Sequence, residues 1–499
     1  MEKKLRVGII GATGMVGQRF ACLLENHPWF DIVALAASKR SSGLTYEEAV
    51  GDRWKMPTAM PEKYKKMVIM DADNVEEVCS KVDFVFCAVS LNKEETKKLE
   101  ERYAKCETPV VSNNSANRHT DDVPMIIPEI NGEHAKVIES QRKRLGTTRG
   151  FIAVKPNCSI QSYVPALNAL KEFGLEPKMS YYEGDEERQS PSVYAVLDSG
   201  KPGPRLMLIG HTDTVKVANG WNTDPFTPIE DGDKTYGLGA MDMKGGLAAI
   251  LATTKYYSEN KDKFTGELIL AFVSDEENLS KGTYQLVNEG LSADMAIMAE
   301  CRFDNMAIGF RGRYSIEVTV SGKAAHASHY PNVGENALIY GSKLAIAIEE
   351  LPTIIHPTLG GGTWVVRSIE GGVKNALIVP EKCELFIDRY TVPGETYEVC
   401  EKQILEAADK LGLSGKVDVR LKPRKSAYME PFALEEAHIL VQTVKETFKE
   451  VTGDEIRIEF DKSVCDSNIL ANSLNIPTVT FGPSGGNMHG ANEYGHVHQ

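Results

Sequence analysis

The sequence of 499 residues is long enough for two to four domains. Its net charge of −14 argues against a nucleic-acid-binding protein, because such proteins present basic surfaces. No apolar run is long enough to cross a membrane, and the N-terminus lacks the apolar segment of a signal peptide. The nine cysteines form no C-x-x-C pair, which is typical of reduced thiols. We therefore expect a cytoplasmic protein whose partner is a small-molecule substrate, with no nucleic acid and no membrane.

The first elements of the chain form a nucleotide-binding pattern. An apolar run over residues 5–10 predicts a strand, and QRFACLLENH predicts a helix. The turn between them, residues 11–17, has the sequence GATGMVG, in which glycines let the backbone approach a pyrophosphate at the helix N-terminus. The candidate cofactor-binding residues of this turn are Gly11, Thr13, Gly14, Met15 and Val16.

The next strand, DIVALAAS, indicates which dinucleotide is bound. An NAD site has an acidic residue near the end of this strand, whereas here the chain continues with Ser38, Lys39, Arg40 and Ser41. A basic, hydroxyl-rich end suits a 2′-phosphate, so the pattern favours NADP, held by Ser38, Arg40 and Ser41. The alternative is a fold of the same type that binds no ligand.

Two further motifs carry a family resemblance. They are SNNSANR, which ends at Arg118, and KPNCS, which contains Cys158. With the GATGMVG turn, they make residues 1–172 resemble the N-terminal, NADP-binding half of aspartate-semialdehyde dehydrogenase. The resemblance implies a Rossmann-type domain in which Cys158 is the nucleophile and Arg118 binds phosphate. A lone cysteine is otherwise more often a buried apolar residue.

This resemblance stops after ALNALKEFGLEP. The general-acid/base histidine and the substrate-binding arginine that the dehydrogenases carry in their second domain do not follow. Cys158 is therefore not expected to support the dehydrogenase cycle. A dehydrogenase remains the second hypothesis for the chain, and a non-catalytic binding protein the third.

The second part of the chain carries candidate metal ligands at the ends of apolar, strand-like runs. RLMLIG leads to one histidine, LILAFVS to an Asp-Glu-Glu triplet, ADMAIMA to a glutamate and IPTVTFGP to a second histidine. In a parallel sheet with helices on both faces, such residues gather outside the carboxyl ends of the strands. Imidazole and carboxylate ligands suit zinc, and also cobalt or manganese. The candidate ligands are His211, Asp242, Glu277, Glu300 and His489.

From about residue 173 the sequence is similar to the M20 metallopeptidases, a group that includes succinyl-diaminopimelate desuccinylase, acetylornithine deacetylase and carboxypeptidase G2. The motifs that carry the similarity are HTDTV, GLGAMDMKGG, DEE, and the positions of Glu300, His326, Asn375, Asp388, Arg389 and His489. The similarity implies a two-zinc amidohydrolase or peptidase that cleaves an N-acyl amino acid or small peptide with a free carboxylate. One zinc would take His211, Asp242 and Glu300. The other would share Asp242 and take Glu277 and His489.

The same similarity assigns the catalytic and substrate-binding residues. Glu276 would be the general base, and Asp213, on the same side of its strand as His211, would orient that imidazole. His326 would stabilise the oxyanion, and Asn375 and Arg389 would hold the substrate carboxylate. The alternatives are a structural histidine, a turn asparagine and an ion-paired strand arginine.

The sequence therefore predicts an α/β chimera of two enzyme segments. Residues 1–172 would form the truncated Rossmann-type domain, and residues 173–307 with 416–499 the M20-type catalytic domain. Residues 308–415 would form an inserted α+β lid through which the protein dimerises.

Overall fold

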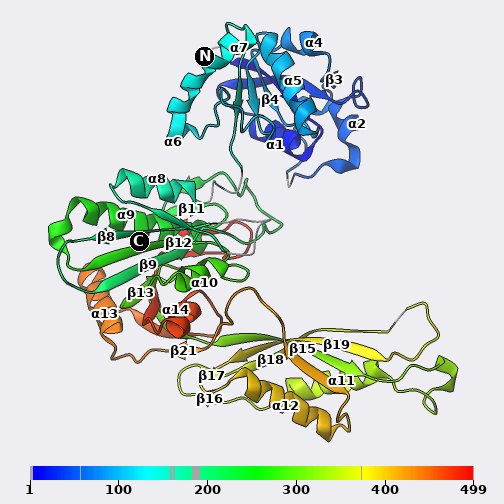
Figure 1. Cartoon of the computed structure of the whole chain (residues 1–499), viewed down its shortest axis with the longest axis vertical. Helices are drawn as coiled ribbons and strands as arrows, with labels where there is room; N and C mark the ends of the chain where they lie inside the picture. Colours follow the sequence, from blue (N-terminus) through cyan, green and yellow to red (C-terminus); the bar gives the residue numbers. More distant parts are fainter. Residues whose placement is uncertain are drawn as a thin grey trace. The chain divides into compact units, whose positions relative to one another are not determined.

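The computed structural model describes residues 4–56, 58–157, 160, 163–182, 191–372 and 374–497. The chain divides into two compact units, Met1–Gln161 and Ser162–Gln499 (Figure 1). Each unit has its own sheet and its own core. Among the described residues, every helix is too short or too polar to span a lipid bilayer.

The first unit contains a six-stranded sheet whose described pairings are all parallel. The strand order is β3-β2-β1-β4-β5-β6. Successive strands are added on one side of β1 up to β3, and from β4 onward they are added on its other side, so the strand order reverses between β1 and β4. This is the order of dinucleotide-binding sheets, in which the ligand lies at that reversal. The strands are β1 (Leu5–Ile10), β2 (Phe30–Ala37), β3 (Met70–Asp71), β4 (Phe84–Cys87), β5 (Val110–Ser112) and β6 (Ile152–Val154).

Helices cover both faces of this sheet because its central strands are apolar on both sides. Ile9 and Leu35 pack in one core with residues of α1 and α2, whereas their neighbours Ile10 and Ala36 pack in the opposite core with α4 and α5. The helices are α1 (Met15–Leu23), α2 (Tyr46–Val50), α3 (Glu62–Lys65), α4 (Val75–Cys79), α5 (Lys93–Lys105), α6 (Pro128–Asn131) and α7 (Ile138–Leu145).

The second unit is built on a nine-stranded mixed sheet. Its path is β21-β14-β23-β13-β9-β12-β8-β7, with β22 paired to β14. The four central strands β23, β13, β9 and β12 are parallel to one another. The strands are β7 (Lys178–Ser180), β8 (Ser192–Asp198), β9 (Arg205–His211), β12 (Glu267–Val273), β13 (Met295–Met298), β14 (Asn305–Phe310), β21 (Phe432–Ala433), β22 (Arg457–Asp461) and β23 (Thr478–Thr480).

Helix α8 (Val164–Glu172) begins the second unit at the seam between the two resemblances. Ala166 and Leu170 are buried in the same core as the central strands, and α8 contacts α9 and β8. The segment 163–172, which the sequence places with the first domain, therefore packs in the second unit. The other helices around this sheet are α9 (Gly245–Glu259), α10 (Lys281–Asn288), α13 (Ile439–Thr452) and α14 (Ser467–Ser473).

The inserted lid is a four-stranded antiparallel sheet of order β18-β19-β15-β20 with two helices packed on it (Figure 1). Its strands are β15 (Gly312–Ser321), β18 (Thr363–Gly371), β19 (Lys382–Thr391) and β20 (Val417–Leu421), and its helices are α11 (Ala337–Glu349) and α12 (Tyr397–Lys410). The short strands β16 (Ile355–His356) and β17 (Gly360–Gly361) form a separate pair.

A small antiparallel ribbon of order β10-β11-β25-β24 completes the second unit. Its strands are β10 (Ile229–Asp231), β11 (Lys234–Tyr236), β24 (Gly485–Gly486) and β25 (Tyr494–His496). The ribbon brings the C-terminal segment beside the loop that leads into α9.

Candidate metal centre and nucleotide cradle

The four parallel central strands deliver four of the candidate ligands to one edge of the sheet. His211 is the last residue of β9, Glu277 follows β12, Glu300 follows β13 and His489 follows β23. The four strands end at about the same height in the sheet, since His211 pairs with Val273 and Met298 pairs with both Ile209 and Thr480. This is the carboxyl edge at which the sequence predicts the ligands to converge.

Asp242 lies between the two histidines. Its Oδ1 is 3.0 Å from Nε2 of His211, and its Oδ2 is 3.0 Å from Nε2 of His489. The same nitrogen of His489 lies 3.2 Å from Oε2 of Glu277. One carboxylate thus presents an oxygen to each of two imidazoles, which is the arrangement of a bridging ligand.

Glu276 lies in the same cluster as the metal-ligand candidates. Ligand atoms of His211, Glu276 and Glu300 all lie within 4.8 Å of one another, as do those of His211, Asp242 and Glu277. The geometry therefore offers Glu276 as a neighbour of a metal ion as well as a base. Glu276 shares one of these groups with Glu300, and Glu277 shares the other with Asp242.

Asp213 anchors the turn that carries the two glutamates. Its carboxylate accepts the backbone N–H of Glu276 and of Glu277, each at 3.2 Å. Nδ1 of His211 lies 3.1 Å from the carbonyl oxygen of Asp213 and 3.7 Å from its carboxylate. Asp213 therefore fixes the position of the Glu276 turn in addition to facing the imidazole.

Burial raises the pKa of two glutamates in this cluster. It raises the pKa of Glu300 to about 7, with the charges of Asp242 and Asp466 adding to the effect. Burial, and then the charges of Glu300 and Asp466, also raises the pKa of Glu276 well above its ordinary value. Asp466 is fully buried and accepts a hydrogen bond from Thr283 at 2.5 Å. The sequence did not single out Asp466, because it follows no strand-end pattern.

These residues fit divalent cations. The cluster holds more carboxylates than imidazoles, and close like charges in a low-dielectric site are costly without a counter-charge. Within the described part of the chain, Oε1 of Glu277 is buried and has no hydrogen-bond partner. An acceptor of this kind, beside His489 and Asp242, is satisfied by a cation.

A cavity of about 290 Å³ opens onto the cluster and adds positive charge to it. Besides metal-ligand candidates it is lined by Arg302, Arg313 and Arg424. Arg302 pairs with Glu459 at 3.0 Å and Arg313 with Asp388 at 2.9 Å. The sequence predictions did not include these arginines, although each lies close to a strand end. Arg302 also pairs with Asp461, so neighbouring carboxylates offset part of the charge of Arg302 and Arg313.

The lid places Arg389 in its core. The side chain is fully buried, forms an ion pair with Glu395 and lies 4.6 Å from the ring centre of Trp364. Arg389 is thus held as the ion-paired strand residue that the sequence left open as its alternative. It is not among the residues that line the metal-site cavity.

His326 and Asn375 lie on exposed parts of the lid. Nδ1 of His326 is 2.8 Å from Oγ of Ser328, and the His326 backbone bridges to Ile378. Asn375 lies in a turn three residues before that bridge, so the two segments are neighbours. Neither side chain lines the cavity beside the metal-ligand cluster.

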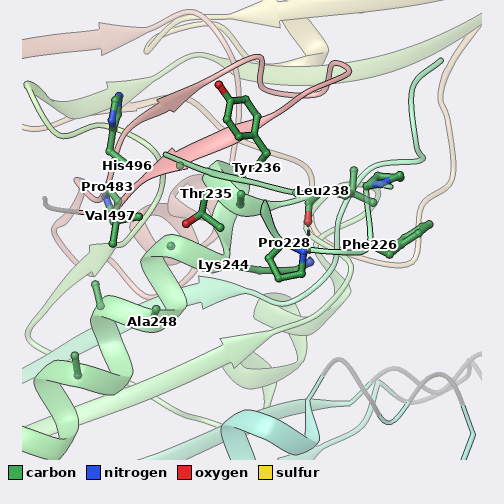
Figure 2. A pocket seen from close by; sticks show the side chains of 17 residues that line it. Phe226, Pro228, Thr235, Tyr236, Leu238, Lys244, Ala248, Pro483, His496 and Val497 are labelled. Carbon is green, nitrogen blue, oxygen red and sulfur yellow. Dashed lines mark hydrogen bonds between the residues drawn. The ribbon is translucent and has the colours of Figure 1, made fainter. Parts of the chain in front are cut away.

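A larger cavity, of about 620 Å³, is lined by other parts of the loop that carries Asp242 (Figure 2). Leu238, Ala240 and Lys244 line it together with alanines of α9. The lining is mainly apolar and contains none of the candidate metal ligands. We take the smaller cavity as the candidate active site because candidate metal ligands line it.

In the first unit, the turn after β1 has the geometry that its glycines allow. Gly11 has a φ of 87°, and a Cβ atom there would lie 2.5 Å from the carbonyl oxygen of Ala88. A Cβ atom on Gly17 would lie 2.3 Å from the oxygen of Gly11. The backbone of this turn therefore packs at distances that only glycine permits. Gly14 is the N-cap residue of α1. Because glycine has no side chain, the N-cap position offers no side-chain acceptor to the first backbone N–H groups of α1.

The other nucleotide-site candidates lie at nearby strand ends. Ser38 and Arg40 are exposed and Ser41 is half-buried, just after β2. Arg118 follows β5 and donates from Nε to the carbonyl oxygen of Lys155 at 3.2 Å. Thr13, Met15 and Val16 occupy the turn and the start of α1. Cys158 lies outside the described residues.

A buried carboxylate of α5 holds the loop that carries Arg118. Glu100 is fully buried and accepts hydrogen bonds from Ser112 at 2.5 Å, Asn114 at 3.1 Å and Asn117 at 2.7 Å. This explains why the SNNSANR motif needs several short polar residues. Glu100 itself could not be identified from the sequence, because it stands within an ordinary charged helix.

The chain matches two family models. Residues 6–138 match the NAD binding domain of semialdehyde dehydrogenase, and residues 207–499 match peptidase family M20/M25/M40. Aspartate-semialdehyde dehydrogenase of Archaeoglobus fulgidus is 42% identical over 211 residues, which cover 42% of this chain and 55% of the relative. The chain thus spans about half the length of the curated dehydrogenases it matches.

Relatives of the second part are peptidases and amidohydrolases. Succinyl-diaminopimelate desuccinylase of Nitrosomonas eutropha is 29% identical over 311 residues, covering 59% of this chain and 79% of that protein. A tripeptidase from Staphylococcus aureus shares the fold with a TM-score of 0.55, at 22% identity over 67% of this chain and 87% of that one. A metallo-carboxypeptidase of the M20 family from Sulfolobus solfataricus has a TM-score of 0.54, at 19% identity over 68% of this chain and 90% of that one.

These matches agree with the structure, in which the dinucleotide-type sheet and the metal-ligand cluster occupy separate units. The M20 match also extends through the lid and includes His489. The chain belongs to peptidase family M20/M25/M40, and the part that precedes this match is similar to the NAD binding domain of semialdehyde dehydrogenase.

Proposed function

We propose that the second unit is a dinuclear zinc amidohydrolase that cleaves an N-acyl amino acid or a small peptide with a free carboxylate. The position of Asp242, with one oxygen 3.0 Å from each of two histidines, carries this proposal. His211, Asp242 and Glu300 would hold one ion, and Asp242, Glu277 and His489 the other. Cobalt or manganese would fit the same donors.

The bound ions supply Lewis acidity, which lowers the pKa of water and polarises a carbonyl group. Glu276, in the wall of the cavity, takes the proton of the attacking water and passes it to the leaving amine. Asp213 holds Glu276 in place through its backbone N–H. The arginines of the cavity orient the anionic end of the substrate.

The test is a panel of N-succinyl, N-acetyl and dipeptide substrates assayed with zinc or cobalt. We expect one class to be hydrolysed, with a loss of roughly 100- to 10,000-fold in Glu276→Gln at unchanged metal content. Glu450→Gln, at an exposed carboxylate on α13, is the matched control and should keep full activity. Full activity in Glu276→Gln would overturn the proposed mechanism.

For the first unit we propose NADP binding without dehydrogenase activity. The strand order and the glycine turn support a dinucleotide, and Arg40 supports a 2′-phosphate. NADPH fluorescence titration checks binding, with Arg40→Ala expected to weaken NADPH more than NADH. Phosphate-dependent formation of NADPH from aspartate semialdehyde, lost in Cys158→Ser, would instead favour the dehydrogenase hypothesis.

We also propose that the protein dimerises through the lid. Strand β18 is at the edge of the lid sheet, and its Val365 and Ile369 are each 41% exposed. An exposed apolar edge strand is suited to pairing with a second copy. Sedimentation velocity should show a dimer for the unaltered chain and a monomer for Ile369→Lys, and a monomer for both would refute the proposal.

A further inference from the structure

Glu493 is a buried carboxylate near the metal-ligand cluster to which no role has yet been assigned. It follows His489 by four residues, and only 2% of its surface is exposed. It stands directly before β25, which pairs with β11 so that Tyr494 lies opposite Tyr236. This pairing brings Glu493 beside the loop 237–244, which carries Asp242.

The carboxylate of Glu493 accepts three backbone hydrogen bonds from that loop. Oε2 accepts the N–H of Gly239 at 2.7 Å, and Oε1 accepts those of Met241 at 3.0 Å and Asp242 at 2.9 Å. The Glu493 carbonyl oxygen also accepts the N–H of Gly237 at 3.0 Å. Hydrogen bonds to a buried charged group are among the stronger polar contacts in a protein.

The loop 237–244 needs such partners because it is not a regular helix. Gly239 has a φ of 73°, and two residues inside the segment have non-helical dihedrals, Asp242 at −113° and 93° and Met243 at −134° and 38°. On the far side of the loop, Nζ of Lys244 donates to the carbonyl oxygen of Leu238 at 2.7 Å (Figure 2). A Cβ atom on Gly495 would lie 2.7 Å from the oxygen of Ala240, so β25 packs directly against the loop.

We propose that Glu493 is a positioning residue of the metal centre. Its carboxylate fixes the backbone at Asp242, so that the two oxygens of Asp242 face His211 and His489 at the same time. Because Asp242 is shared by both ions, loss of Glu493 weakens both metal sites rather than one. This inference rests on the proposed two-metal centre and adds to it a residue that touches neither ion.

The experiment compares the full-length chain with Glu493→Gln. Glutamine keeps the size of the side chain but presents only one acceptor oxygen, and it turns an amide N–H₂ toward backbone donors. Each protein is stripped of metal and titrated with cobalt, with affinity followed by calorimetry and coordination by the visible absorption of the bound ion. Glu450→Gln serves as the exposed control.

We expect Glu493→Gln to lose about 10- to 100-fold in cobalt affinity at both sites, the usual effect of removing a group that orients metal ligands. Its cobalt spectrum should also change, a signature that a loss of fold stability alone would not produce. Circular dichroism at the titration temperature confirms that the variant is folded. If it is not, Glu493→Asp, whose shorter side chain cannot reach all three amides, takes its place.

Unchanged affinity and spectrum in the folded variant would overturn the positioning role. Failure of the unaltered chain to bind cobalt would instead overturn the proposed metal centre itself, so the two ideas fail by different results.

Discussion

His489 and Asp242 face each other at 3.0 Å, between the imidazole Nε2 and the carboxylate Oδ2, although they lie far apart in the sequence of the second unit. A cation that joins them binds only the folded chain, so zinc should raise the melting temperature. The gain is about 2.7 kcal/mol when free zinc exceeds its Kd a hundredfold. Addition of EDTA should reverse it.

His489→Ala tests this linkage. The variant should show a smaller rise in melting temperature at the same zinc concentration, measured by differential scanning calorimetry. His119→Ala, at an exposed histidine of the first unit, should respond like the unaltered chain. Equal zinc-dependent rises in all three proteins would mean that His489 is not a ligand.

Arg389 distinguishes a structural role from substrate binding. Arg389→Met leaves the charge of Glu395 buried and unpaired, so we expect a loss of about 3–5 kcal/mol in the free energy of unfolding, measured with urea. Arg420→Met is the control, because Arg420 is 59% exposed and pairs with Glu317 on the surface of the same lid. Its loss should be about 0–1 kcal/mol. A rise in KM for Arg389→Met without loss of stability would show instead that Arg389 binds substrate.

Two neighbouring glycines offer a matched test of the nucleotide turn. A Cβ atom on Gly17 meets the oxygen of Gly11 at 2.3 Å, whereas the nearest atom to one on Gly14 is that same oxygen at 3.5 Å. Gly17→Ala should therefore cost the first unit about 1–3 kcal/mol of stability, and Gly14→Ala less. Thermal unfolding followed by calorimetry would measure both. Equal losses would show that α1 does not pack on the turn as described.

Glu107 gives a prediction of pH dependence. Backbone hydrogen bonds from Gly150, Thr148 and Arg149 hold its pKa at about 2, below its ordinary value of 4.5. A carboxyl group with a lowered folded-state pKa stabilises the fold above its unfolded pKa, and that contribution is lost as the pH falls through the folded value. Protection of the amides of residues 148–150 should therefore decline between pH 4.5 and about pH 2.

Hydrogen exchange read by mass spectrometry follows these amides locally, after correction for intrinsic exchange rates. Glu107→Gln should show low protection with little pH dependence across the range. Glu129→Gln, at an exposed carboxylate of the same unit, should keep the unaltered profile. An unaltered profile in Glu107→Gln would show that the Glu107 carboxylate does not protect these amides.

The features that the sequence predicted well are local ones. An apolar run and the polar residue that ends it stand together in the chain, so the ends of β9, β12, β13 and β23 could be recognised one at a time. Parallel pairing then brings them to one edge without further information. The glycine turn of the first unit is local in the same sense, because Gly11, Gly14 and Gly17 stand next to the strand and helix that they join.

The burial of Arg389 agrees with a pattern in its own strand. Along β19 the residues Cys383, Leu385, Ile387 and Arg389 are all buried, with the period of two that places them on one face. That alternation predicts a side chain inside the lid. The family resemblance favoured the substrate-binding role instead.

The remaining contacts could not be predicted because they are non-local. Glu493 lies 251 residues from the amide of Asp242 that it binds, and nothing near it in the sequence distinguishes it from a surface glutamate. At the seam, the apolar face of α8 is compatible with either sheet. Its place in the second unit was decided by tertiary packing.

The distance in sequence between Asp242 and Glu493 has a consequence for the order in which the protein is made. His211, Asp242, Glu277 and Glu300 leave the ribosome well before His489, and Glu493 follows all five of them. During synthesis there is therefore a stage at which the loop 237–244 has been made but the carboxylate that accepts its backbone N–H groups has not. The loop that carries Asp242 therefore reaches its final hydrogen bonding late, once β25 pairs with β11 and Glu493 accepts the backbone N–H of Asp242.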